Sequence, residues 1–121
     1  MVKTRGLTHI HLAVRDVQRS LKFYREVFGM HERFWVGPHM VFLNTPGSND
    51  VITLRQADGG ETVGASGGIG HFGFGIDRTQ DLDTAIQDVI TAGGSLVERG
   101  EHAPGVPFAY LADPDGYVIE L

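Results

Sequence analysis

Three polar residues in this chain have the types and positions needed to hold one divalent metal ion. His9 and His71 each begin an alternating stretch, and Glu120 stands near the end of the sequence. Two imidazoles and one carboxylate suit Fe(II) or Mn(II) best, with Zn(II), Co(II) or Ni(II) as alternatives, and they leave coordination positions open. The chain contains no cysteine, which excludes thiolate ligands and thiolate nucleophiles. These residues predict an open metal site for a small organic molecule.

An internal repeat brings these three residues into equivalent positions. The stretches that begin at His9 and His71 both alternate apolar and polar residues. Near the end of each repeat, Val-Ile-Thr-Leu aligns with Val-Ile-Glu-Leu, so that Thr53 stands where the second repeat has Glu120. If the repeats pair about a pseudo-twofold axis, His9, His71 and Glu120 meet near that axis. Because Thr53 occupies the fourth position, we expect three protein ligands.

Neighbouring residues on the same strand faces extend this predicted site. Alternation puts His11 on the face of His9, where it can support the ligand or substitute for it. Gly73 and Gly75 share the face of His71, and small residues are otherwise a poor choice for a strand. We therefore expect the two glycines to clear space beside the metal for a substrate.

Each repeat is expected to fold as a strand, a helix and three further strands. Apolar residues at helical spacing predict one helix that follows Asp16 and stops at Gly29, and another that follows Asp81 and stops at 93–94. The strands are expected at 9–15, 32–36, 40–44 and 51–55, and then at 71–77, 95–98, 108–112 and 117–121. Helices cover one face of each sheet, so the histidine faces should line a concave surface. The predicted fold class is α+β, with two tandem βαβββ modules forming an open, cleft-like barrel.

Composition and charge limit the other possibilities. The 121 residues suit one domain, with modules at about 6–57 and 69–121 and a glycine-rich linker at about 58–68. The net charge of −5 and the scattered basic residues argue against nucleic-acid binding. The apolar stretches are shorter than the roughly 18 residues that a membrane span requires. The N-terminus lacks the features of a secretory signal, so the expected location is the cytoplasm.

Four segments give the whole chain a resemblance to the vicinal oxygen chelate superfamily. They are Leu7-Thr-His9 with Asp16 seven residues later, Ser20-Leu-Lys-Phe-Tyr24, Gly70-His71-Phe72, and Asp113-Pro-Asp-Gly-Tyr-Val-Ile-Glu-Leu121. That superfamily contains glyoxalase I, extradiol dioxygenases, fosfomycin-resistance transferases and bleomycin-binding resistance proteins. The resemblance implies a single domain whose modules form an open barrel around a metal, usually in a homodimer and often with sites composed from both subunits. It assigns the metal to His9, His71 and Glu120.

The C-terminal segment resembles the extradiol dioxygenase signature in order and spacing. His102, Tyr110 and Glu120 fall at signature positions, with Ala109 in place of a larger residue. The resemblance implies that His102 and Tyr110 contact substrate oxygens and support proton transfer. Glyoxalase I enzymes generally have a fourth ligand where this chain has Thr53. The leading interpretation is therefore a metal-dependent oxidoreductase of the dioxygenase type, acting on a small substrate with adjacent oxygens.

Two other interpretations stay open. A glyoxalase-like isomerase or lyase, or a fosfomycin-type thiol transferase, would use the same metal as a Lewis acid. A metal-free resistance protein of the bleomycin-binding type would sequester a drug or metabolite, although the retention of His9, His71 and Glu120 argues against it. The expected partners are a small-molecule substrate and a second copy of the chain, with no nucleic acid and no membrane.

Overall fold

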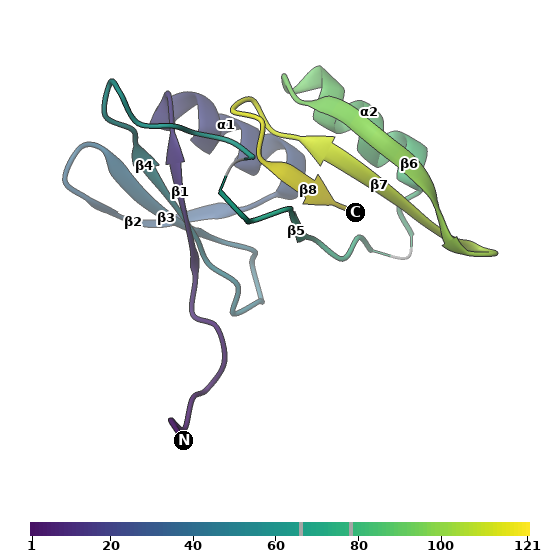
Figure 1. Ribbon diagram of the computed structural model, residues 1–121, viewed down its shortest axis with the longest axis horizontal. Helices are drawn as coiled ribbons and strands as arrows, with labels where there is room; N and C mark the ends of the chain where they lie inside the picture. Colours follow the sequence, from purple (N-terminus) through teal and green to yellow (C-terminus); the bar gives the residue numbers. More distant parts are fainter. Residues whose placement is uncertain (66, 78) are drawn as a thin grey trace.

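The computed structural model describes every residue except Ser66 and Arg78, and it contains two βαβββ modules (Figure 1). The first module consists of β1 (Ile10–Val14), α1 (Val17–Phe28), β2 (His31–Val36), β3 (Met40–Asn44) and β4 (Ile52–Gln56). The second consists of β5 (Phe72–Gly73), α2 (Leu82–Thr91), β6 (Ser95–Ala103), β7 (Val106–Ala112) and β8 (Val118–Glu120). Each module has one four-stranded sheet, in the orders β1-β4-β3-β2 and β5-β8-β7-β6. The predicted α+β class with two tandem modules is confirmed, and the sheets stay open.

Strand pairing confirms the equivalence of the two repeats. The first and last strands of each module are parallel neighbours. His11 lies opposite Thr53 in the first module, and Gly73 lies opposite Glu120 in the second. Thr53 and Glu120 therefore occupy the same place in their sheets, as the alignment of the repeats predicts.

Both helices begin at the predicted caps and pack on one face of their own sheets. The Asp16 carboxylate accepts hydrogen bonds from two backbone N–H groups of the first turn of α1, and Asp81 does the same for α2. Gly29 ends α1 with a φ of 63°, a left-handed conformation that glycine adopts without strain. Buried apolar residues of both modules, from Leu12 to Ile119, form one core cluster. Among the described residues, no helix is long and apolar enough to cross a membrane.

The strand β5 is shorter than predicted. It covers only Phe72 and Gly73, whereas the alternating pattern predicts a strand over 71–77. Its partner β8 has three residues, so few backbone groups are available to extend the ladder. Glycines also weaken an extended strand, because they lose more backbone entropy and bring no side chain to pack.

The strand β6 is longer than predicted and changes the position of His102. The sequence predicts a strand that stops at 98, with His102 in the following loop, and this part of the prediction is wrong. Ala103 and Val106 pair directly across a two-residue turn, so the ladder continues through His102 with a local irregularity before Ala103. The tight hairpin turn accommodates Pro104.

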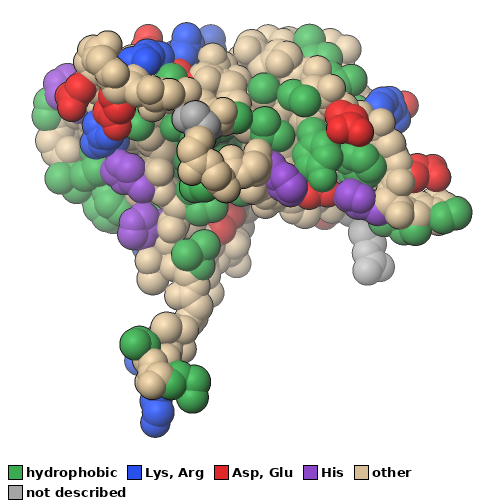
Figure 2. Space-filling model, viewed as in Figure 1, with side chains coloured by type: hydrophobic (Ala, Val, Ile, Leu, Met, Phe, Trp, Pro, Cys, Tyr) green, Lys and Arg blue, Asp and Glu red, His purple; other side chains and the backbone are tan. Residues whose placement is uncertain are grey.

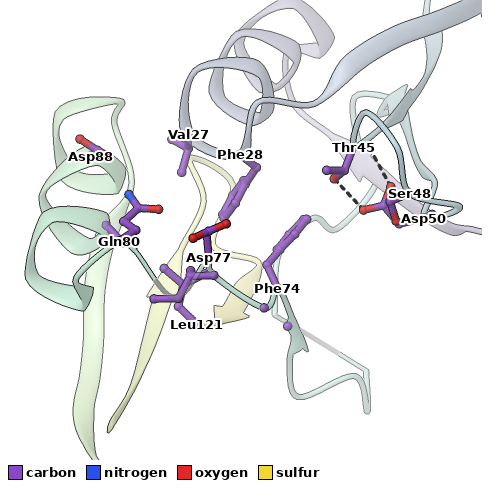
Figure 3. Close-up of a pocket in the computed structure, with 14 residues that line it drawn as sticks. Val27, Phe28, Thr45, Ser48, Asp50, Phe74, Asp77, Gln80, Asp88 and Leu121 are labelled. Atoms are coloured by element: carbon purple, nitrogen blue, oxygen red, sulfur yellow. Dashed lines mark hydrogen bonds between the residues drawn. The ribbon is translucent and has the colours of Figure 1, made fainter.

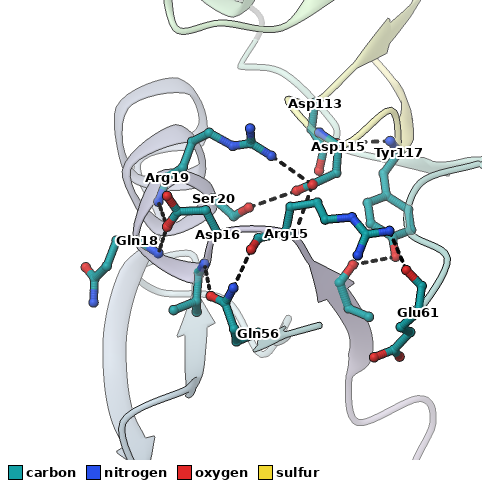
Figure 4. A network of polar contacts seen from close by, with 12 residues as sticks. Arg15, Asp16, Gln18, Arg19, Ser20, Gln56, Glu61, Asp113, Asp115 and Tyr117 are labelled. Carbon is teal, nitrogen blue, oxygen red and sulfur yellow. Dashed lines mark hydrogen bonds and ion pairs between the residues drawn. The ribbon is translucent and has the colours of Figure 1, made fainter. Parts of the chain in front are cut away.

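The turn between β7 and β8 binds the first module (Figure 4). The Asp115 carboxylate has no exposed surface. It accepts hydrogen bonds from the Arg15 backbone N–H at 3.1 Å, the Arg19 guanidinium at 2.8 Å and the Ser20 hydroxyl at 3.1 Å. We call residues 113–116, with the groups of the first module that they contact, the module latch.

Asp113 forms the buried part of the module latch. Its side chain is 4% exposed and accepts a hydrogen bond of 2.8 Å from the Tyr24 hydroxyl. It also accepts backbone N–H groups of Asp115 and Tyr117, both at 2.9 Å. The Tyr117 hydroxyl in turn donates to the Ala13 carbonyl at 2.7 Å. Much of the segment that resembles the extradiol signature therefore joins the two modules.

Asp113 should make folding stability depend on pH in an unusual direction. Burial raises the pKa of this carboxyl, and the hydrogen bonds from Tyr24 and the backbone only partly oppose that rise. Its contribution to stability is therefore greatest below the unfolded-state pKa and is lost as pH rises through the folded-state pKa. As pH rises from below the ordinary pKa of aspartate toward neutrality, we expect wild-type protein to lose stability relative to Asp113→Asn, which does not titrate. Urea unfolding at several pH values measures the difference, and a difference that favours wild type as pH rises would contradict the prediction.

Candidate metal centre

Two imidazoles of the second module flank the carboxylate of Glu120. The His71 Nε2 atom lies 3.1 Å from Glu120 Oε2, and the His102 Nε2 atom lies 2.7 Å from Glu120 Oε1. The side chains of Glu120, His71 and His102 are 27%, 42% and 51% exposed, so a small molecule can reach them from solvent. The hydrogen bond with His102 contributes most to holding the pKa of Glu120 below its usual value, so the carboxylate is charged at neutral pH.

Aromatic residues of β7 support both imidazoles. Tyr110 pairs with Glu120 across the sheet, and its ring centroid lies 4.9 Å from that of His71. The Phe108 ring stacks on His102, with centroids 4.2 Å apart and planes 18° apart. Thus His71 just before β5, His102 on β6 and Tyr110 on β7 lie around the Glu120 carboxylate of β8.

His9 lies on the first module, apart from this cluster. Its Nδ1 atom lies 2.9 Å from the Thr8 hydroxyl, and its ring centroid lies 6.4 Å from that of Phe42. Figure 2 shows histidine side chains over both halves of the molecule instead of at one place. Within the described parts of the chain, no group of three or more His, Asp or Glu residues is arranged to hold a metal. One chain therefore brings His71 and Glu120 together, but not His9 with them.

In the first module, the residue at the position equivalent to Glu120 is buried and out of reach of solvent. Thr53 is fully buried, and its Oγ1 atom has no hydrogen-bond partner in the described structure. Phe42, the neighbour of Thr53 on β3, stacks with Phe34 at a centroid distance of 4.4 Å. A buried neutral hydroxyl is poorly suited to bind a metal, so the expectation of three protein ligands without Thr53 stays a prediction.

His11 is held by a guanidinium group. Arg55 Nε donates to His11 Nε2 at 3.3 Å, and Arg55 also pairs with Glu61 at 2.5 Å. Burial, followed by the charge of Arg55, lowers the pKa of His11, so this imidazole is neutral. Since Nε2 accepts a hydrogen bond, the proton of the neutral ring resides on Nδ1. The structure thus places His11 in a polar cluster of the first module instead of beside His71.

Gly73 lies close to the backbone of Glu120, its partner on β8. A Cβ atom at Gly73 would lie 3.3 Å from the Glu120 carbonyl oxygen and 3.7 Å from the Glu120 Cβ, whereas one at Gly75 would meet nothing within 4 Å. The predicted role of the two glycines, to clear space for a substrate, therefore stays a prediction.

Two clefts lie where the modules meet, and neither is lined by the imidazoles that flank Glu120. One of about 550 Å³ is lined by Phe28, which stacks on Phe74, and by Asp77 (Figure 3). The other, of about 250 Å³, is lined by His9, Phe72 and further residues of β1 and β5. The beginning of β1 and the strand β5 thus share a groove, although they belong to different sheets.

Comparison with known proteins identifies the family. A model of the Glyoxalase/Bleomycin resistance protein/Dioxygenase superfamily matches residues 6–121, and the chain belongs to that superfamily. The resemblance inferred from the sequence is therefore confirmed.

The most similar curated relatives include several lactoylglutathione lyases. One from Arabidopsis thaliana is 31% identical over 97% of this chain but only 44% of its own length, so the chain spans less than half of that relative. Probable lactoylglutathione lyases of Synechocystis sp. and Vibrio cholerae are 30% and 31% identical, over 95% of this chain and 92% and 88% of their own. These names favour the isomerase or lyase alternative over the dioxygenase interpretation.

Solved structures share the fold. A glyoxylase/bleomycin resistance protein/dioxygenase domain from Frankia sp. has a TM-score of 0.75 and 27% identity, covering 98% of this chain and 96% of its own. The fosfomycin resistance protein FosX from Listeria monocytogenes, as an E126Q mutant complexed with Mn(II) and 1S,2S-dihydroxypropylphosphonic acid, has a TM-score of 0.77 and 22% identity. That match covers 98% of this chain and 90% of FosX.

Proposed function

We propose that this protein is a metal-dependent lyase or isomerase that acts on a small substrate binding through two adjacent oxygens. The charged Glu120 carboxylate beside the His71 imidazole, on a face that solvent reaches, is the observation that carries the proposal. The lactoylglutathione lyases among the relatives support this class of chemistry.

The proposed metal ligands are His9, His71 and Glu120. Imidazole nitrogens and a carboxylate suit Fe(II) or Mn(II), with Zn(II), Co(II) or Ni(II) as alternatives. The Mn(II) complex of the related FosX supports a divalent metal. When bound, the metal would act as a Lewis acid on the substrate oxygens and stabilise negative charge that develops there.

The residues of the second module have separate roles in this proposal. Glu120 stays ionised because His102 and His71 contact its two oxygens. Tyr110 lies against His71, and its hydroxyl is available to donate a hydrogen bond to a substrate oxygen. Its ring and that of Phe108, with centroids 5.1 Å apart, also shield one side of the site from water.

We further propose that His9 reaches the metal from a second copy of the chain. His9 and the pair of His71 and Glu120 belong to different modules, and among the described residues of one chain no hydrogen bond or ion pair joins them. A homodimer that faces the first module of one subunit with the second module of the other would unite them. Exposed apolar side chains on the sheets, among them Phe34 and Val97, are suited to such an interface.

Activity with the substrates of the relatives tests the reaction. Methylglyoxal and glutathione together contain the atoms of lactoylglutathione, which is a thioester. If Mn(II)-loaded protein forms this thioester from the two compounds, it catalyses the lyase reaction in the reverse direction. We expect turnover that a chelator abolishes and added Mn(II) restores. Oxygen uptake with a catechol in the presence of Fe(II), without thioester formation, would instead support the dioxygenase interpretation and overturn the proposal.

Mixing two inactive variants tests whether the site is shared between subunits. His9→Ala and His71→Ala each destroy every site in their own homodimers. In a co-expressed mixture, roughly half of the dimers contain both variants, and each has one intact site if ligands come from two subunits, so roughly a quarter of wild-type activity should return. Recovery of no activity, although mass spectrometry shows mixed dimers, would place all ligands within one chain.

A further inference from the structure

We propose that His102 is a metal ligand of this centre and supplies the fourth ligand that Thr53 does not. The inference rests on the proposed metal site at His71 and Glu120. It gives His102 a different role from the substrate contact that the sequence resemblance implies.

His102 and His71 stand in the same relation to Glu120. Each presents Nε2 to a different oxygen of one carboxylate, and the His102 contact of 2.7 Å is shorter than the His71 contact of 3.1 Å. These are hydrogen-bonding positions, and the described side chains form no ready-made metal cage. Because both imidazoles are about half exposed, small rotations can direct both Nε2 atoms toward a cation held by the carboxylate. The resulting donor set of two imidazoles and one carboxylate suits Fe(II) or Mn(II).

A series of contacts in the β6–β7 hairpin places His102 at this position. Gly100 pairs with Phe108, and a Cβ atom at Gly100 would lie 3.1 Å from the Phe108 ring. The absence of that side chain lets the ring lie against β6, where it stacks on the His102 imidazole. Stacking restricts the imidazole and reduces the conformational entropy lost when it binds a ligand.

The β6–β7 hairpin of the second module is longer than the β2–β3 hairpin of the first. β6 has 9 residues, whereas β2 has 6, and β7 has 7 residues against 5 in β3. The added length carries His102, which therefore departs from the internal symmetry. In the first module, the position equivalent to Glu120 is occupied by the buried Thr53.

A fourth ligand also determines how a substrate binds. If His71, His102, Glu120 and His9 of the partner subunit held a six-coordinate divalent metal, about two positions would stay open. Two positions match a substrate that binds through two adjacent oxygens.

Metal binding by His102 variants tests the proposal without relying on catalysis. The probe is Mn(II), titrated by calorimetry into wild type, His102→Ala, His102→Gln and His102→Asp. We expect the first two variants to lose more than ~100-fold in affinity, beyond the 10- to 100-fold typical of residues that only support a ligand. His102→Asp should retain much of the affinity because a carboxylate replaces the ligand. Pulsed electron paramagnetic resonance of bound Cu(II) should show one fewer coupled histidine in His102→Ala than in wild type.

Other outcomes would overturn the inference in distinguishable ways. If His71→Ala loses Mn(II) but His102→Ala binds it like wild type, His102 is no ligand and the proposed metal site still stands. If wild-type protein does not bind Mn(II), both proposals fail. Thermal melts should match among the variants, because His102 is exposed and its replacement leaves no buried group unpaired.

Discussion

Glu120→Gln should abolish metal binding and activity while the protein stays folded. The amide has nearly the same shape as the carboxylate but lacks the negative charge that His71 and His102 flank. We expect Mn(II) affinity to fall more than ~100-fold. We also expect kcat/KM to fall about 10³-fold, comparable to the largest losses seen when one electrostatic contact is removed from an active site. Calorimetry and the thioester assay measure the two losses.

A control variant on the same sheet distinguishes the loss of the Glu120 carboxylate itself from the loss of one unit of net negative charge. Glu101 lies on β6 beside His102 and is exposed, so Glu101→Gln also removes one negative charge. This variant should bind Mn(II) and turn over like wild type. Normal metal content in Glu120→Gln would refute the proposed centre, provided that its circular dichroism spectrum shows a folded protein.

Asp115→Ala should strongly destabilise the protein, because Asp115 is an acceptor that joins the module latch to the first module. The substitution removes an acceptor with no exposed surface and leaves the Ser20 hydroxyl and the Arg15 N–H without their partner. Arg19 is half exposed and can turn to water, so its share of the loss is small. We expect the free energy of unfolding to fall by about 2 to 3 kcal/mol, measured by urea denaturation.

Asp88→Ala provides the matched control for this prediction. Asp88 lies on the exposed side of α2, and its replacement should change stability by less than about 0.5 kcal/mol. If Asp115→Ala is as stable as Asp88→Ala, the module latch contributes little to folding. A large loss would show that the β7–β8 turn holds the modules together, because its contacts cross from one module to the other.

The module latch and the proposed centre share one short segment of the chain. Asp113 and Asp115 bind α1 and the end of β1, whereas Glu120 emerges from β8 toward the imidazoles. A change in the latch can therefore displace β8 and Glu120 together. For this reason, activity of latch variants should be compared only after their folding has been checked.

Local patterns in the sequence were sufficient to predict most of the fold. The caps at Asp16 and Asp81, the stop at Gly29 and the spacing of apolar residues depend on neighbours within a few positions. The equivalence of Thr53 and Glu120 followed from the repeat, and the sheet pairing agrees with it. Such features are visible in a sequence because periodicity and capping are local consequences of backbone geometry.

Tertiary structure alone decided which polar side chains meet. His102 reaches Glu120 only because a two-residue turn and an irregularity in β6 set the register of the hairpin, and a shift of one residue would turn it to the other face. Likewise, the contact of Asp115 with Ser20 joins residues 95 positions apart, and no local pattern reports it. The sequence determined the two modules and the residue types that can bind a metal. The packing of the chain placed His71, His102 and Glu120 together and left His9 outside this group, because these distances depend on how whole strands pair and not on the residues alone.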